Sequence, residues 1–543
     1  MPKTRNSCLE ACARSLFSFG PQAENLPDSR RWQVPARRDY LIRSTIFILA
    51  VFATPNVGLA QLLDRPIVIR NARVISQPGQ ITEIASILIK GGKIEAVGPD
   101  VRAPFLSQTF DAAGKTVTAG LIDAWSALGR LGGSDQADPT SDVWDAFDRY
   151  DRDDFREALR NGVTTVYVAP NSGPGICGTS VIVALAPEGT QSAGELLGRS
   201  VALHVNLASN QSPVSRMRTF DDVRKQFRKA LDYRQALEDY EQDLKEYLDK
   251  LKERREKKEA KDKPKEGVEK KEAGGKKNSK PKEDSPPSDK PKTDAKKAPA
   301  ATMFGVSTAK RLRPADEKKS DKRGDKEDKN DNRDKKPEAK DGDKLTKPAK
   351  PAPDRKMEAL LRAIDHKLPV RIEAQRSEDI LNALALAREF NLDLLIEGAT
   401  DAYLVADKLA ETKTPVVLGP VLRTAVFENN EYRRHTERNA AALEKAGVLW
   451  TAASGADEAL STRSVAFNAQ LAARFGGGNS WLETVTTRAA RVLGLADRIG
   501  RVEVGHRADL VIWTGDPGDP ASRVERVFVA GKLAYLAPEA KGP

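Results

Sequence analysis

The sequence predicts an α/β protein built around a (β/α)8 barrel, and three observations lead to this fold class. Short apolar strands alternate with helical patterns from Thr118 onward, the two ends of the region after residue 60 are rich in β-branched runs, and a charged tract interrupts the series. Alternating strands and helices imply a parallel sheet covered by helices. Eight strand candidates fit a closed barrel. An open doubly wound sheet has the same periodicity and stays open as the alternative.

A leader for export is predicted at residues 1–60. Three arginines between positions 37 and 43 precede the apolar run 45–53, and the segment 58–60 places small residues at the −3 and −1 positions of a cleavage site. The apolar run is too short to span a bilayer comfortably. We therefore expect an exported protein, periplasmic or extracellular; an uncleaved leader would make it membrane-anchored. Cleavage removes two of the three cysteines, which leaves Cys177 without a partner for an intramolecular disulfide.

The segments on either side of the barrel region are predicted to form β-structure. After the leader, turn residues separate short β-branched runs at 67–69, 72–75, 86–89 and 93–97. Near the C-terminus, residues 507–513 and 524–529 alternate in polarity, and the segment 530–532 makes a hairpin turn.

The barrel region supplies its strand candidates in order along the chain. They are 120–124, 163–168, 180–185, 201–205, 370–373, 392–396, 415–418 and 448–452. Helical patterns lie between several of them, at 153–160, 377–390, 402–412 and 431–446. We assign residues 119–250 and 355–496 to the barrel, on either side of an insertion.

A long helix with an apolar seam precedes that insertion. The seam follows a spacing of three and four residues: Val223, Phe227, Ala230, Tyr233, Leu237, Tyr240, Leu244, Tyr247 and Leu251. Such a seam packs within the chain or pairs two copies of the chain in a homodimer.

The insertion at residues 251–354 is a tract of mixed charge with few core-forming residues. Disorder is predicted, because little apolar burial offsets the entropy of ordering. Between positions 251 and 350 there are 34 basic and 22 acidic residues, which leaves 55 basic and 56 acidic residues elsewhere. The net charge of +11 therefore describes this tract and no folded surface. Specific nucleic-acid recognition is disfavoured, whereas weak contact of the insertion with anionic surfaces stays open.

Three motifs resemble those of metal-dependent amidohydrolases, and of imidazolonepropionase-like proteins in particular. They are the approach to the first barrel strand at 111–123, the helix at 484–494, and the C-terminal signature at 499–517 with 527–532. The resemblance covers residues 66–240 and 356–536. It implies a small β-sandwich domain that is built from both chain ends, residues 62–118 and 497–537, and flanks the barrel.

The resemblance also implies hydrolysis of C–N bonds, other than peptide bonds, in cyclic or linear amides. In that family one or two metal ions, usually zinc, activate a water molecule and polarise the carbonyl group. Their ligands come from the C-terminal ends of the barrel strands. Here the matching positions hold Trp125, Ala127, Glu373, Gly398 and Gly455, of which the first two replace a His-x-His pair. Asp457 comes two residues after the position of the catalytic aspartate.

These replacements predict a degenerate homologue, a pseudoenzyme that binds a small molecule or a partner and needs no cofactor. The expected pocket in the barrel mouth consists of Asp123, Trp125, Ala127, Glu373, Glu397, Gly398 and Gly455.

Two alternatives stay open. The first is an active C–N hydrolase with zinc or another divalent metal in a rebuilt carboxylate site, in which Glu373 and Asp457 are the catalytic candidates. The second is an interaction or scaffold protein that acts through the charged insertion.

The histidines and the mature cysteine are expected to be structural. His204 lies in a strand pattern and is interpreted as a core or rim residue, and His506 is expected at the surface. Cys177 is interpreted as a small buried residue, because no histidine can be placed beside it to activate a nucleophile.

Overall fold

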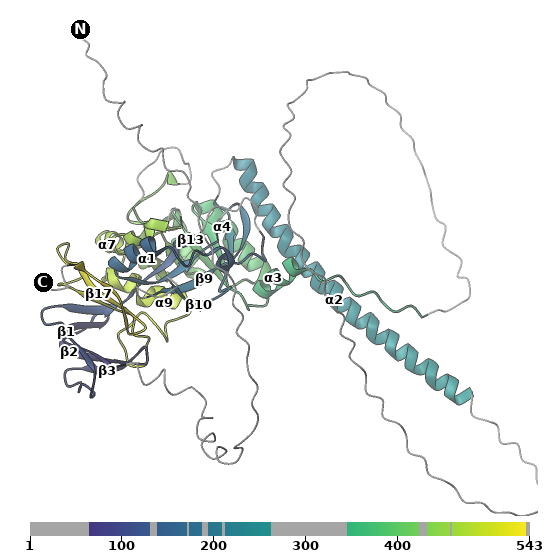
Figure 1. Cartoon of the computed structure of the whole chain (residues 1–543). Helices are drawn as coiled ribbons and strands as arrows, with labels where there is room; N and C mark the ends of the chain where they lie inside the picture. Colours follow the sequence, from purple (N-terminus) through teal and green to yellow (C-terminus); the bar gives the residue numbers. More distant parts are fainter. Residues whose placement is uncertain are drawn as a thin grey trace, which may run out of the picture.

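The computed structural model describes residues 65–130, 138–170, 173–186, 194–208, 212–261, 345–422, 432–456 and 459–538. A barrel of strands and helices forms the larger body, a β domain lies against it, and the helix α2 (Pro213–Lys261) projects away on the other side (Figure 1). The expected leader at residues 1–60 lies outside the described residues.

Eight strand positions form the barrel, as predicted. They are β6 (Leu121–Ser126), β7 (Val163–Val168), a bent strand made of β8 (Gly175–Thr179) and β9 (Val181–Leu185), β11 (Leu203–Asn206), β12 (Val370–Ala374), β13 (Leu394–Gly398), β14 (Val416–Leu418) and β15 (Trp450–Ala452). The strands from β11 to β15 pair in parallel, as do β6 and β7. A parallel bridge between Ser126 and Gly455 joins β15 to β6. The sheet is therefore closed and not an open doubly wound one.

The third strand differs from the expected parallel arrangement. β9 pairs antiparallel with β7, and β8 pairs antiparallel with β11. Parallel neighbours need a crossover of about a dozen residues, and the chain has too few between Val168 and Gly175 for one. The bent strand therefore turns back beside β7 and joins the two parts of the barrel. Outside it, β10 (Gly194–Gly198) adds a further antiparallel strand.

Helices cover the outer face of the strands. They are α1 (Arg152–Arg160), α3 (Arg355–Ile364), α4 (Ser377–Phe390), α5 (Ala406–Glu411), α6 (Asn439–Ala446), α7 (Val465–Arg474), α8 (Trp481–Thr484) and α9 (Thr487–Val492). The prediction for 377–390 is confirmed, whereas the helix predicted from 431 begins only at Asn439. The turns that precede α6 are held against the neighbouring loop by a hydrogen bond, because Nε2 of His435 lies 2.7 Å from the carbonyl oxygen of Val421.

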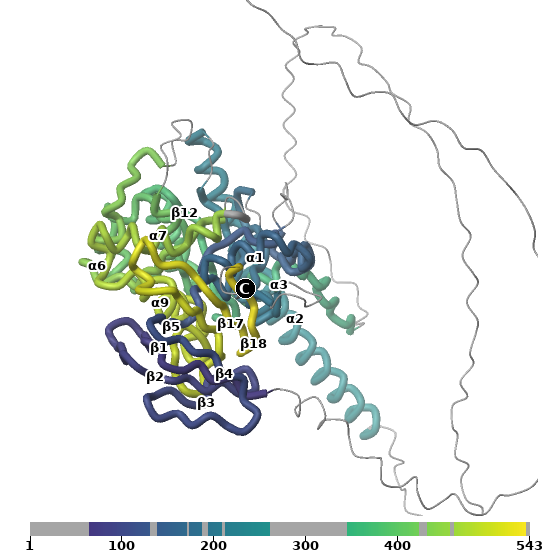
Figure 2. The backbone as a smooth tube through the Cα atoms, turned by 60° about the vertical axis from the view of Figure 1, so that its left-hand side comes forward, coloured from purple at the N-terminus to yellow at the C-terminus, as the bar shows by residue number. Residues whose placement is uncertain are grey.

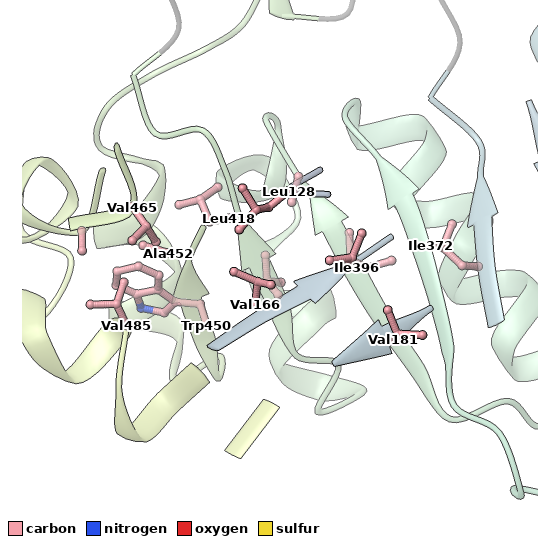
Figure 3. Close-up of a cluster of buried hydrophobic side chains, with 14 of the residues drawn as sticks. Leu128, Val166, Val181, Ile372, Ile396, Leu418, Trp450, Ala452, Val465 and Val485 are labelled. Carbon is pink, nitrogen blue, oxygen red and sulfur yellow. The ribbon is translucent and has the colours of Figure 1, made fainter. Parts of the chain in front are cut away.

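A hydrophobic core fills the layer between strands and helices. Figure 3 shows side chains from several strands, among them Val166, Ile372 and Ile396, together with Val465 and Val485 from the segments that cover them. Each of these five is fully buried. Side chains alternate across a strand. The residues next to Ile372 in β12 and next to Ile396 in β13 therefore face the barrel interior.

The β domain is built from both chain ends, as the resemblance implied. Its strands are β1 (Ile67–Gln77), β2 (Gln80–Lys90), β3 (Lys93–Gly98), β4 (Gln108–Asp111), β5 (Thr116–Ala119), β16 (Leu510–Trp513), β17 (Val524–Val529) and β18 (Lys532–Leu536). They form one continuous sheet and not two separate ones, because the long β1 pairs with β2, β4 and β5. The hairpin turn predicted at 530–532 is confirmed: Ala530 and Gly531 both have positive φ.

The helix α2 is longer than predicted at its outer end. Its inner part packs into the barrel core through Val223, Phe227 and Ala230, and the ring of Phe227 stacks on Phe390 at 5.3 Å. The insertion predicted at 251–354 is shorter than expected at both ends. At its start α2 continues through Lys261, and at its end residues 345–354 are described and lead into α3. Ion pairs four residues apart, Glu246–Lys250 and Glu253–Lys257, support the helix where core contacts end. Residues 262–344 lie outside the described part of the chain.

No helix among the described residues is both long enough and apolar enough to cross a bilayer. The apolar run at 45–53 lies outside that part of the chain.

Candidate functional site at the barrel mouth

The two positions expected to hold the first-strand ligands lie at the end of β6 and just beyond it. Trp125 is 2% exposed and Ala127 3% exposed, and both belong to an apolar cluster with Tyr167, Leu395 and Val417. An indole ring and a methyl group offer no lone pair to a metal ion. The large ring of Trp125 instead fills space at this end of the barrel.

Two further positions are glycines that the backbone requires. Gly398 ends β13 with φ +82°, and a Cβ atom added there would lie 2.2 Å from Nε2 of Gln375. Gly455 has φ +90°, and a Cβ atom there would lie 2.8 Å from Cδ of Pro420. Positive φ strains residues other than glycine. Neither position accepts a histidine side chain without movement of its surroundings.

Two of the three carboxylates of the predicted pocket, Glu373 and Glu397, lie in one layer of the barrel interior. Glu373 and Glu397 are register partners on the adjacent strands β12 and β13. The Glu397 side chain is completely buried, whereas 12% of the Glu373 side chain is exposed. Asn206 is the register partner of Glu373 on the other side.

Arg371, which was not among the predicted site residues, supplies the positive charge at the centre of the barrel. It lies two residues before Glu373 on β12, and its Nε atom forms an ion pair with Glu397. Its NH2 group donates to the carbonyl oxygen of Ala124 at 2.7 Å, and its guanidinium carbon lies 3.5 Å from the ring centre of Tyr167. The side chain is 4% exposed, so strand β6 and the ring of Tyr167 hold the guanidinium in place.

His204 completes this buried cluster from strand β11. Its Nδ1 atom lies 3.1 Å from Glu397, and its Nε2 atom lies 4.0 Å from Glu373. The interpretation of His204 as a core histidine agrees with its full burial, although sequence reasoning missed its charged neighbours. One signal was present in the sequence: Arg371 and Glu373 are two residues apart in a strand and must face the same side.

Charge decides the protonation of Glu397. Burial alone raises the pKa of a carboxyl group, but Arg371 and then His204 outweigh burial and hold the pKa of Glu397 below its ordinary value. Glu397 therefore stays ionised as the counterion of Arg371.

Asp123 lies in a different setting, where strand β6 meets the end of β15. Its carboxylate accepts hydrogen bonds from the backbone N–H of Ser454 at 3.0 Å and from the Ser454 hydroxyl at 2.5 Å. Burial raises the pKa of Asp123 to about 6, although these hydrogen bonds act in the opposite direction. Asp123 is thus part of the barrel closure and has no cationic partner among the described residues.

The donor set does not fit the zinc centre that the resemblance implied. Zinc sites in proteins use several nitrogen, sulfur or carboxylate ligands around one point. Within the described ranges, no group of three or more His, Cys, Asp or Glu side chains is placed to hold a metal ion. At the centre of the barrel, Glu397 instead pairs with the guanidinium of Arg371 and lies beside the imidazole of His204. The position of Asp457 lies outside the described residues.

The remaining candidates have structural surroundings. Cys177 is buried, and burial raises the pKa of its thiol to about 12, which disfavours the nucleophilic thiolate. His506, expected at the surface, is only 7% exposed, because it packs beneath the β domain with its Nε2 atom 3.3 Å from the carbonyl oxygen of Ala496.

Two buried donors near the barrel mouth lack a hydrogen-bond partner among the described residues. They are Nε1 of Trp125, at the end of β6, and Nε2 of Gln375, just after β12. Gln375 is fully buried, and its Oε1 atom accepts from the Thr400 hydroxyl at 2.8 Å. Unpaired buried donors are uncommon in proteins and point to a water molecule or a ligand.

Comparisons with known proteins agree with this architecture. The sequence model of the amidohydrolase family matches residues 354–535. An amidohydrolase of known structure from Thermotoga maritima MSB8 aligns with a TM-score of 0.59 and 24% identity, covering 87% of this chain and all of that one. This likeness concerns the fold.

Sequence relatives match over shorter stretches. A dihydroorotase from Geobacter metallireducens is 32% identical over 108 residues, which are 20% of this chain and 23% of that protein. A 5-methylthioadenosine/S-adenosylhomocysteine deaminase from Desulforudis audaxviator is 66% identical over 32 residues, 6% of this chain and 7% of that protein. The matches therefore span less than a quarter of the length of these curated relatives. The chain is therefore similar to the amidohydrolase family over residues 354–535, and it shares the fold of a solved amidohydrolase.

Proposed function

We propose that this protein is a metal-free member of the amidohydrolase family that binds a small molecule at the barrel mouth without hydrolysing a C–N bond. The observation that carries this proposal is the guanidinium of Arg371, which is paired with Glu397 inside the barrel. A divalent cation beside it would meet a fixed positive charge in a region of low dielectric constant, where like charges repel strongly. The carboxylate that would attract the metal is already neutralised.

The proposed ligand carries hydrogen-bond acceptors. The unpaired donors Nε1 of Trp125 and Nε2 of Gln375 lie near the barrel mouth, and each buried unpaired donor costs about 1–3 kcal/mol. A ligand with carbonyl or carboxylate oxygens would recover that free energy on binding. Apolar neighbours such as Ala127 would contact the rest of the molecule.

One observation favours the second candidate, an active C–N hydrolase. Glu373 is 12% exposed, more than Glu397 below the same mouth, so a substrate could reach its carboxylate. In that case Glu373→Gln would abolish turnover while the far-ultraviolet circular dichroism spectrum stayed unchanged. An unaffected turnover in this variant would exclude Glu373 as the general base.

We also propose that the protein is exported from the cytoplasm, on the basis of the leader predicted at residues 1–60. The amino-terminal sequence of the protein recovered from cell-envelope or extracellular fractions tests this. A terminus at Gln61 supports cleavage, and an intact leader in the membrane fraction supports anchoring.

The decisive experiment on function measures metal content together with turnover. The purified protein is dialysed, reloaded with zinc, manganese or calcium, and analysed for metal per chain; cyclic and linear amides are then screened for hydrolysis. We expect less than about 0.1 metal ion per chain and no hydrolysis above the rate of the buffer. One tightly held ion per chain together with hydrolysis of a cyclic amide would overturn the proposal.

A further inference from the structure

The outer half of α2 presents an apolar seam beyond the reach of the barrel. Beyond Tyr233 the seam continues through Leu237, Tyr240, Leu244, Tyr247 and Leu251, each of which is partly buried, while most residues between them are exposed. The fully buried residues of the helix end earlier, at Ala230, and α3 is joined to α2 by the ion pair of Arg234 with Asp365 at 2.7 Å. This part of the seam therefore lies beyond the buried core of the barrel.

The segment before α3 has the geometry to cover it. Leu345, Pro348 and Pro351 are partly buried, whereas the residues between them are exposed, which is a period of three. Three residues per turn is the repeat of a polyproline II helix, which has no internal hydrogen bonds. The prolines fix φ near the value that this conformation needs. The segment 345–353 thus presents one apolar edge.

The start of this segment is fixed on the helix by a hydrogen bond. The backbone N–H of Asp354 donates to the Tyr233 hydroxyl at 3.3 Å. From there, the segment runs beside α2 toward the outer end of the helix in both views (Figures 1 and 2). The helix and the segment therefore run antiparallel from a common point.

The two lengths match. From Asp354 back to Leu345, a polyproline II segment spans about 28 Å at 3.1 Å per residue. From Tyr233 to Leu251, an α-helix spans about 27 Å at 1.5 Å per residue. Because one polyproline turn of about 9.3 Å is close to the rise of one helical heptad of about 10.5 Å, Pro351 comes level with Tyr240 and Leu345 comes level with Leu251.

We infer that residues 345–353 form a polyproline II arm that closes the seam of α2 within a single chain. Proline rings pack against the Tyr and Leu side chains of the helix, so the outer half of α2 is stable without a second copy of the chain. This replaces the homodimer that an unpaired seam would permit. It also places Leu345 and Lys261, the described residues that flank positions 262–344, both on the outer half of α2 and away from the barrel.

The test compares proline substitutions at matched positions. In the full chain, the double variant Pro348→Ser/Pro351→Ser removes two rings from the apolar edge, whereas Pro353→Ser changes an exposed proline of the same arm. Hydrogen–deuterium exchange is followed in the peptides that cover residues 237–251. We expect exchange there to become at least about tenfold faster in the double variant, with peptides of the barrel and the Pro353→Ser protein unchanged.

Light scattering after size exclusion distinguishes the possible occupants of the seam. A monomer whose seam peptides lose protection in the double variant supports the arm. Unchanged protection in the double variant would overturn it. A dimer whose seam peptides lose protection on dilution would also overturn it, because the seam would then be covered by a second copy.

Discussion

Two carboxylates inside the barrel are equally buried and have opposite electrostatics. Glu397 and Asp123 are each 0% exposed. Glu397 has a guanidinium beside it and its pKa is lowered, whereas Asp123 has only hydroxyl and amide donors and burial raises its pKa to about 6. The difference teaches that a full positive charge, and not hydrogen bonding alone, keeps a buried carboxylate ionised in this barrel.

The largest expected effect comes from removing the positive charge. Arg371→Met leaves Glu397 buried without its partner, and breaking a buried ion pair in this way costs about 3–5 kcal/mol of unfolding free energy. Urea denaturation at pH 7 measures the loss. The double variant Arg371→Met/Glu397→Gln removes both charges, and we expect it to recover at least about 2 kcal/mol. Equal stability of the single and double variants would mean that the pair is not coupled.

The second effect is the pH dependence that Asp123 contributes. Its pKa is raised in the folded protein from 3.8 to about 6, so the folded state binds the proton more tightly than the unfolded state. Its contribution to the unfolding free energy therefore rises by about 2.4 kcal/mol as the pH falls from 7 to 4.

The comparison of wild type with Asp123→Asn isolates the pH-dependent contribution of Asp123 to the unfolding free energy, because asparagine does not titrate. The difference in stability between them should favour wild type progressively as the pH falls from 7 to 4. Glu397 acts in the opposite sense and only at lower pH, since its lowered pKa gives stability that is lost below its ordinary value of 4.5. A difference between the two proteins that stays constant from pH 4 to 7 would contradict the raised pKa.

The smallest effect is expected from Ser454, which donates from its hydroxyl to Asp123 at 2.5 Å. Ser454→Ala removes this donor, so the cost should be about 1–3 kcal/mol at pH 8, where the carboxylate is ionised. It should shrink at pH 5, where the protonated carboxyl accepts fewer hydrogen bonds and so needs one donor fewer. Ser461→Ala, in the turn before α7, serves as a control that does not contact Asp123. A cost independent of pH would assign Ser454 a packing role only.

Much of the fold could be predicted from the pattern of residues. The strand at 163–168 and the helix at 377–390 have the predicted bounds. The antiparallel bent strand could not be predicted, because an apolar run such as 181–185 carries no sign of its direction. Its direction follows from the length of the connection and from the neighbours that it finds.

The sequence could predict which metal-ligand positions lack a histidine, but it could not predict which residues occupy the centre of the barrel instead. Trp125, Ala127, Gly398 and Gly455 could be placed by resemblance, and their part in a lost metal site stays a prediction. In the structure the first two are buried in an apolar cluster and the two glycines have positive φ. The role of Arg371 could not be predicted, because an arginine in a strand usually reaches solvent. Only the closed barrel, with Tyr167 and Ala124 facing it across the interior, makes this residue central.

The sequence by itself determined the order of strands and helices, the β character of both ends and the absence of histidines at the matching ligand positions, because these follow from local periodicity and residue identity. Only the tertiary structure decided which charges meet inside the barrel and what lies along α2. The reason is that an ion pair such as Arg371–Glu397 or a hydrogen bond such as Asp354–Tyr233 joins residues from separate elements, and its strength depends on burial that exists only after the chain has closed.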